Sequence, residues 1–216
     1  MDRRRFEGEL TADRTIDLGT LNTLGVDAFT AMLGGIFEHS SWVAHAAWVA
    51  RPFASVPALH ATMVAIVTNS GADRQLALLR AHPELAQSGP LTAASSAEQG
   101  GMGLDRLAAD EAAAFDALNA AYRTRFGFPF IIAVRGQRDR AAIRAALSVR
   151  LRNSPDQERA AALVEVAKIA RFRLDDLIMP PANGSLRQIR PPDGACARHR
   201  TWPSSRGTPA VSVPNS

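Results

Sequence analysis

Apolar residues recur at helical spacing along most of this chain, and this periodicity limits its fold more than any other feature. Phe29, Met32 and Ile36 repeat three or four positions apart, as expected for one apolar face of a helix. Similar stripes run through residues 42–49, 55–66, 72–81, 110–126, 139–151 and 154–177. We therefore expect an all-α, single-domain bundle of about seven to nine helices, covering residues 20–178 after a lead-in segment at 1–19.

One apolar segment interrupts this pattern, at residues 128–134 (Phe-Pro-Phe-Ile-Ile-Ala-Val). It is short and β-branched, which is typical of a buried strand. With no second strand expected in the chain, such a strand would leave its backbone groups unpaired. We therefore predict an extended lead into a helix, whose exposed amides could hold a flat polar ring. A plain role in the core is the alternative for these side chains.

The composition favours one domain without a membrane span. At 216 residues and 46% hydrophobic content, the chain can bury one substantial core. Apolar runs such as residues 42–50 are shorter than the roughly 18 residues that a membrane helix needs. The start, Met-Asp-Arg-Arg-Arg-Phe-Glu, lacks the apolar stretch of a secretory signal. We expect a cytoplasmic protein with no membrane partner.

The net charge of +4 comes from the end of the chain. Residues 180–216 hold five arginines and one aspartate, so residues 1–179 are formally neutral. A neutral body does not offer the basic face that nucleic-acid binding requires. Seven of the 13 prolines also fall in the last 37 residues, which predicts a disordered Pro/Arg-rich tail over residues 179–216.

Cysteine and histidine spacing gives no metal motif. The single cysteine, Cys196, lies in the tail and allows no disulfide framework or cysteine cluster. His39 and His45 are six positions apart and form no His-Glu-x-x-His pattern. No metal site is expected.

His82 is the first candidate for chemistry. It precedes Pro83, and a residue before proline is pushed out of helical geometry, so the apolar helix before it should end here. The negative end of the helix dipole favours a protonated imidazole by about 0.3–1 kcal/mol. An imidazole poised near neutral pH is a common proton carrier. The alternative is that His82 only caps the helix or fills the junction.

Glu98 has two interpretations as well. The pattern Ser95-x-x-Glu98 is that of a capping box, in which the serine and the glutamate satisfy backbone N–H groups at a helix start. A helix start also collects free donors and can bind an anionic ligand. The pattern alone allows either role or both.

Several ordered blocks resemble one family. The blocks are Arg-Ala-His-Pro-Glu-Leu-Ala at 80–86, Ser95-x-x-Glu98-Gln99 with Gly-Leu-Asp at 103–105, Phe-Gly-Phe-Pro-Phe-Ile-Ile-Ala-Val at 126–134, and the flanking stretches 34–43 and 169–177. Together they resemble the OHCU decarboxylases, where OHCU is 2-oxo-4-hydroxy-4-carboxy-5-ureidoimidazoline, an intermediate of urate breakdown. The resemblance runs from about residue 20 to residue 178.

The resemblance implies a decarboxylase that needs no cofactor and converts OHCU to (S)-allantoin. It implies His82 as the acid/base and Glu98 as a group that positions the substrate or assists proton movement. The implied substrate-binding residues are Pro83, Ser95, Ser96, Gln99, Phe130, Ile131, Ile132, Ala133, Val134 and Arg173. Arg173 is chosen from the triplet Phe-Arg-Leu at 172–174, and its guanidinium fork suits a carboxylate or ureido oxygen, although most arginines on such a helix face water.

The resemblance also covers partners and the tail. The small-molecule substrate is the expected partner. Relatives in this family are often dimers, which makes a homodimer one option, but the sequence does not settle the oligomeric state. Residues 205–210 are weakly similar to the opening of a 5-hydroxyisourate hydrolase domain, but the rest of that domain is absent and no hydrolase activity is implied. His39 is a secondary candidate near the site.

The competing hypothesis is a non-enzymatic helical module that binds a partner through a groove around Trp42 and Phe128.

Overall fold

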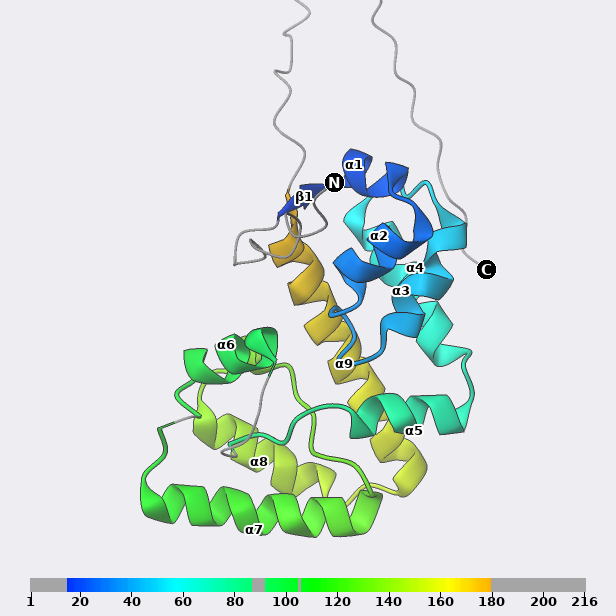
Figure 1. Cartoon of the computed structure of the whole chain (residues 1–216). Helices are drawn as coiled ribbons and strands as arrows, with labels where there is room; N and C mark the ends of the chain where they lie inside the picture. Colours follow the sequence, from blue (N-terminus) through cyan, green and yellow to red (C-terminus); the bar gives the residue numbers. More distant parts are fainter. Residues whose placement is uncertain (1–14, 87–91, 105, 180–216) are drawn as a thin grey trace, which may run out of the picture. The chain divides into compact units, whose positions relative to one another are not determined.

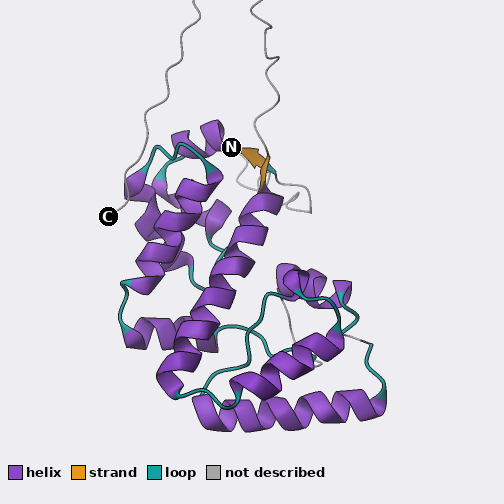
Figure 2. Cartoon of the chain, turned by 180° about the vertical axis from the view of Figure 1, so that it is seen from behind, coloured by secondary structure: helices purple, strands orange, loops and turns teal. Residues whose placement is uncertain are grey.

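The computed structural model describes residues 15–86, 92–104 and 106–179, and its all-α architecture confirms the predicted fold class (Figures 1 and 2). The α-helices of this part are α1 (Leu18–Thr23), α2 (Val26–Leu33), α3 (Ser41–Ala47), α4 (Val56–Thr68), α5 (Ala72–Arg80), α6 (Ala93–Gly101), α7 (Ala109–Phe126), α8 (Arg140–Arg150) and α9 (Pro155–Leu177). Two 3-10 turns, η1 (Trp48–Ala50) and η2 (Val134–Gly136), and two strands, β1 (Ile16–Asp17) and β2 (Ile178–Met179), complete it. The tail at 180–216 and residues 1–14 of the lead-in lie outside the described residues.

The two short strands are a departure from the sequence prediction. β1 and β2 pair in parallel, with Ile16 opposite Ile178 and Asp17 opposite Met179. The prediction placed residues 16–19 in the lead-in and Met179 in the tail, and expected no strand pair. Two residues are too few for an alternating apolar pattern, so the sequence carried no signal of this pairing.

Side-chain caps start three helices at the residues with which the predicted stripes 55–66, 139–151 and 154–177 begin. Ser154 accepts a hydrogen bond from the Gln157 amide at 3.3 Å, and the Gln157 side chain accepts one from the Ser154 amide at 2.9 Å, so α9 begins with a complete capping box. Asp139 caps α8 and Ser55 caps α4. These caps fix where the long helices begin, and the spacing of their apolar residues sets which faces are buried.

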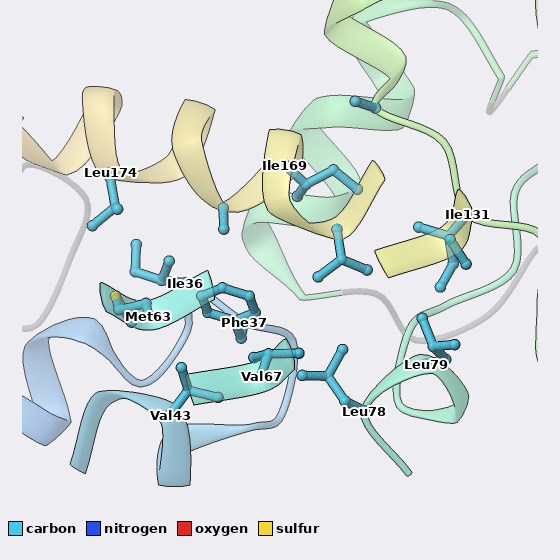
Figure 3. Close-up of a cluster of buried hydrophobic side chains, with 14 of the residues drawn as sticks. Ile36, Phe37, Val43, Met63, Val67, Leu78, Leu79, Ile131, Ile169 and Leu174 are labelled. Atoms are coloured by element: carbon cyan, nitrogen blue, oxygen red, sulfur yellow. The ribbon is translucent and has the colours of Figure 1, made fainter. Parts of the chain in front are cut away.

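The core forms where α9 lies against the earlier helices. Figure 3 shows side chains of α3, α4, α5 and α9 gathered in one cluster, with Ile36, Phe37 and Ile131 from the connecting segments. α9 contacts α4, α5 and α7, so the last helix packs against helices from the middle of the sequence. Its buried face carries Ile169 and Leu174 but also the charged Arg173, and a buried charge requires partners.

Residues 128–133 form neither helix nor strand and lead into η2 and then α8. This confirms the predicted extended lead. The backbone here pairs with side chains, since Arg150 Nη1 donates to the Ile131 carbonyl at 2.6 Å and the Ala133 amide donates to Glu165 Oε2 at 2.9 Å. Phe128 and Phe130 are buried, so the segment belongs to the core as well.

None of the helices in the described part is both long and apolar enough to cross a membrane.

Candidate active site

A small cavity lies where the α5–α6 connection, α6, the extended segment and α9 meet. It encloses about 350 Å³ of empty space, part of which is open to solvent. Its lining residues are His82, Pro83, Leu85, Ser95, Glu98, Gln99, Phe130, Ile131, Ile132, Val134, Ile169 and Arg173. Ten of the twelve residues singled out from the sequence are therefore brought together here.

The cavity does not reach the other two, Ser96 and Ala133. Ser96 is exposed, because one step along a helix turns a side chain by about 100° from the face that carries Ser95. Ala133 is buried, and its amide donates to Glu165 rather than into the cavity. Two lining residues, Leu85 and Ile169, were not foreseen, since each looks like an ordinary core position in the sequence.

His82 follows the end of α5, as the proline rule predicted, and is 8% exposed. Its Nδ1 lies 3.0 Å from the Leu78 carbonyl. Because a carbonyl only accepts, Nδ1 carries the proton and the lone pair lies on Nε2. His82 thus caps the last turn of α5 and lines the cavity at once.

The charge state of His82 differs from the prediction. Burial lowers the pKa of the imidazole to about 4, although its hydrogen bond to the Leu78 carbonyl and the nearby Glu38 carboxylate act in the opposite direction. The expectation of an imidazole poised near neutral pH was wrong, because loss of hydration outweighs a dipole effect of about 1 kcal/mol or less. At neutral pH His82 is a neutral base.

Glu98 lies inside α6 and not at its start. The N-cap of α6 is Thr92, whose side chain accepts from the Ser95 amide at 3.2 Å, so of the two interpretations of Ser95 and Glu98 the capping box is wrong. Ser95 and Glu98 are three positions apart and therefore share one face of the helix. Both side chains line the cavity.

Arg173 organises the polar side of the cavity. Its Nε and Nη2 donate to the two oxygens of Glu98 at 2.9 and 3.1 Å. Nη1 donates to Glu38 Oε2 at 2.7 Å and to the Gly35 carbonyl at 3.1 Å, and Nη2 also donates to Ser95 Oγ at 3.1 Å. A guanidinium has five N–H donors, and each of them has an acceptor in the protein.

Glu38 is a member of this group that the sequence analysis missed. Its carboxylate is 1% exposed and accepts from Thr92 Oγ1 at 2.7 Å as well as from Arg173. Burial raises the pKa of Glu38, but the hydrogen bonds from Thr92 and Arg173 together lower it by more, so the net shift is downward. Its position within 34–43, one of the stretches that resemble the family, was the only signal in the sequence.

The charge on Arg173 is secured in turn by its partners. Burial lowers the pKa of the guanidinium, but the hydrogen bonds and charges of Glu98 and Glu38 raise it, and the net shift is upward. The buried charges are therefore compensated locally, as buried ions require.

Gln99 connects the two parts of the chain that carry His82 and Glu98. Its Oε1 accepts from the Ala86 amide at 3.1 Å, and its Nε2 donates to the Glu84 carbonyl at 3.4 Å. These bonds join α6 to the segment that follows Pro83. The relative placement of the imidazole and the carboxyl group thus depends on Gln99.

Metal ligation finds no support in this part of the chain. No group of three or more His, Cys, Asp or Glu side chains able to hold a metal ion occurs among the described residues. His39, the secondary candidate, is 68% exposed at its side chain and does not line the cavity.

Comparison with known proteins places the chain in a family. Residues 22–175 match the family model for OHCU decarboxylase. A 2-oxo-4-hydroxy-4-carboxy-5-ureidoimidazoline decarboxylase of Haloferax volcanii is 43% identical over 159 residues, which cover 74% of this chain and 94% of that protein. The uric acid degradation bifunctional protein PucL of Bacillus subtilis is 42% identical over 158 residues, which cover 73% of this chain and 32% of that protein.

A solved structure agrees with the sequence matches. A crystal structure of (S)-allantoin synthase superimposes with a TM-score of 0.61 at 36% identity, and covers 76% of this chain and 54% of that one. The match to the family model alone spans well over half of the 216 residues. This chain belongs to the OHCU decarboxylase family.

Proposed function

We propose that this protein decarboxylates OHCU to (S)-allantoin in urate breakdown, with no cofactor. The observation that carries the proposal is the meeting of His82 and Glu98, with Arg173 behind Glu98, in one small cavity. Family membership and relatives bearing the names of OHCU decarboxylases support it.

The substrate itself supplies the electron sink that a decarboxylation needs. The carbon that loses CO2 in OHCU lies next to an imine-like carbon, so the electrons of the breaking C–C bond can move into the ring. The protein must hold the carboxylate out of the ring plane, stabilise the developing anion and deliver a proton to one face. Each task falls to groups that line the cavity.

His82 is suited to the proton transfers. Its neutral imidazole with a free lone pair on Nε2 can accept the proton of the substrate's hydroxyl group and pass it to the neighbouring ring carbon. The electron pair of the broken C–C bond leaves a negative charge on the ring nitrogen, which takes a proton from the solvent to which the cavity is partly open. With a pKa of about 4 in the unliganded cavity, the imidazolium is a good acid and returns a proton readily to the ring. Delivery from one fixed side of the cavity explains the formation of a single enantiomer.

Glu98 and Arg173 act as a pair in this proposal. The two-point ion pair fixes the Glu98 carboxyl group, which then positions the substrate or assists the proton movement. The role predicted for Arg173, direct contact with a substrate oxygen, requires that oxygen to replace one of the present acceptors of the guanidinium. Ser95 and the Gly35 carbonyl, both at 3.1 Å, are the uncharged acceptors available for exchange.

The rest of the lining shapes a site for a flat ring. Phe130, Ile131, Ile132 and Val134 supply one apolar wall, and Ile169 supplies part of another. Pro83 shapes the turn beside His82. Apolar walls with a few fixed polar groups are typical of small-molecule sites.

The decisive experiment supplies OHCU freshly from urate with urate oxidase and hydroxyisourate hydrolase. Ultraviolet absorbance follows its loss and circular dichroism follows (S)-allantoin. We expect the protein to accelerate both signals, and His82→Ala and Glu98→Ala to remain folded but to lose the acceleration. Ser96→Ala, an exposed neighbour outside the cavity, is the matched control and should stay fully active. Full activity in either of the first two variants would contradict the assignment.

The competing hypothesis of a partner-binding groove has little support in the structure. Phe128 is 2% exposed, and Trp42 is partly buried with the Arg74 guanidinium over its ring.

A homodimer, a cytoplasmic location and the absence of nucleic-acid or membrane partners stay predictions. Light scattering on the purified protein tests the first of them.

A further inference from the structure

Glu165 on α9 binds the backbone of the cavity wall without lining the cavity itself. Its Oε2 accepts from the Ala133 amide at 2.9 Å, and its Oε1 accepts from Lys168 Nζ at 2.6 Å. Glu165, Ile169 and Arg173 are spaced four residues apart and therefore share one face of α9. The last two line the cavity, so Glu165 lies one turn beyond it on the same face.

Arg150 on α8 binds the same wall at the next peptide. Its Nη1 donates to the Ile131 carbonyl at 2.6 Å, and its guanidinium lies 4.7 Å from the centre of the Phe130 ring. Its Nε donates to Glu158 Oε1 at 2.8 Å, and Glu158 is fully buried. Glu158 therefore fixes the guanidinium of Arg150, which in turn binds the Ile131 carbonyl.

These two contacts fix the peptide planes on both sides of Ile132. In a planar trans peptide the C=O and N–H groups point in opposite directions, and neither peptide is among the cis bonds of the described chain. Because the Ile131 carbonyl points at Arg150, the Ile132 N–H points away from Arg150. Because the Ala133 N–H points at Glu165, the Ile132 carbonyl points away from Glu165.

Ile132 consequently keeps a free donor and a free acceptor. Neither its N–H nor its carbonyl bonds to another residue in the described part of the chain, and Ile132 lines the cavity beside Ile131, which is labelled in Figure 3. A donor and an acceptor on one extended residue match the neighbouring N–H and C=O groups of a cyclic urea or amide.

We propose that Glu165, assisted by Arg150, is a positioning residue that orients the Ile132 backbone for the ring of the substrate. This inference rests on the proposed function, because it takes OHCU as the ligand. Ala133 is 1% exposed, so its amide without Glu165 would be buried and unpaired. Rotation of the Ile132–Ala133 peptide toward another acceptor would relieve that cost, and it would turn the Ile132 carbonyl at the same time.

The test compares three variants at and beside Glu165 in the coupled OHCU assay. Glu165→Ala removes the acceptor, Glu165→Gln keeps an oxygen that can accept from Ala133, and Lys168→Ala removes only the ion pair. We expect Glu165→Ala to raise KM for OHCU about tenfold with kcat changed less than about threefold, as for one lost hydrogen bond. Glu165→Gln and Lys168→Ala should remain within about threefold of the wild type in both constants.

A second variant guards against a misfolded Glu165→Ala. Arg150→Lys keeps a positive charge beside Glu158 but loses the fork that reaches the Ile131 carbonyl, and it should raise KM in the same way. A lower melting temperature with unchanged KM in the folded variants would show a merely structural role and overturn the inference. Wild-type protein that fails to turn over OHCU would instead overturn the proposed function, and this inference with it.

Discussion

Arg173 and Glu98 form a two-point ion pair, with Nε to Oε1 at 2.9 Å and Nη2 to Oε2 at 3.1 Å. The two parallel hydrogen bonds fix both the position and the plane of the Glu98 carboxyl group. Arg173 comes from α9 and Glu98 from α6, so the pair also connects two helices that are far apart in the sequence. The catalytic geometry that we propose depends on this connection.

Replacing Arg173 with lysine should separate charge from geometry. Lysine keeps a positive charge but cannot donate two parallel bonds to Glu98 while also reaching Glu38. We expect Arg173→Lys to lower kcat/KM for OHCU by about a hundredfold, as for an ångström-scale misplacement of a reacting group. Steady-state kinetics in the coupled assay measure this, with circular dichroism as the check on folding. Near wild-type kcat/KM would show that charge alone suffices.

Glu38 should matter for activity although it does not line the cavity. Glu38→Gln keeps the size of the side chain but removes the charge that faces Arg173, leaving a buried guanidinium less well compensated. We expect a loss of about 1–3 kcal/mol in the free energy of unfolding and a fall in kcat. The control is His45→Ala, at an exposed position of α3. Equal effects of the two substitutions in urea unfolding and in kcat would refute this role of Glu38.

The buried His82 should make stability depend on pH. Its pKa is about 4 in the folded protein against 6.5 for an ordinary histidine, so between these values the unfolded chain binds a proton that the folded protein does not. Stability attributable to His82 is therefore full above about pH 6.5 and decreases as the pH falls toward 4. We expect a loss of about 2 kcal/mol between pH 7 and pH 5 from this residue.

Urea unfolding at pH 7 and pH 5 tests the contribution of His82. A His82→Gln variant lacks the titrating group, so its free energy of unfolding should decrease less between the two pH values than that of the wild type. Carboxyl groups titrate in both proteins and cancel in the comparison. Identical pH dependence in the two proteins would count against a pKa near 4.

Tyr122 should contribute to stability through the group that supports Arg150. Its hydroxyl donates to the fully buried Glu158, and burial together with this hydrogen bond raises the pKa of the phenol. Tyr122→Phe removes a donor and should cost about 1–3 kcal/mol of unfolding free energy. Guanidinium unfolding gives the value, and unchanged stability would mean that the remaining donors, Arg150 and Asn153, satisfy Glu158 fully.

Local patterns predicted the helices well but located one important helix start wrongly. Asp139 and Ser154 cap α8 and α9 at the residues where the predicted stripes begin, because a cap depends on residues a few positions apart. In α6 both Thr92 and Ser95 have suitable side chains, and the structure uses Thr92. The choice depends on Glu38, which binds the hydroxyl groups of both and lies more than fifty residues earlier.

The site was predicted in part for a similar reason. His82 and Glu98 were selected through the family resemblance, because the local pattern around each fits a helix cap equally well. Glu38 lies in no such pattern, and its partner Arg173 is 135 positions away. The charge state of His82 was also out of reach, because burial depends on the packing of the whole domain and not on the helix that precedes it.

The pairing of Ile16 with Ile178 has a consequence for how the helical body loosens. α1 begins directly after β1, and α9 ends directly before β2, so the strand pair connects the first and last helices of the described part. Neither α1 nor the end of α9 can unfold without breaking the hydrogen bonds between β1 and β2, and this exposes the other strand. Fraying of α1 and of the last turn of α9 is therefore a single cooperative event.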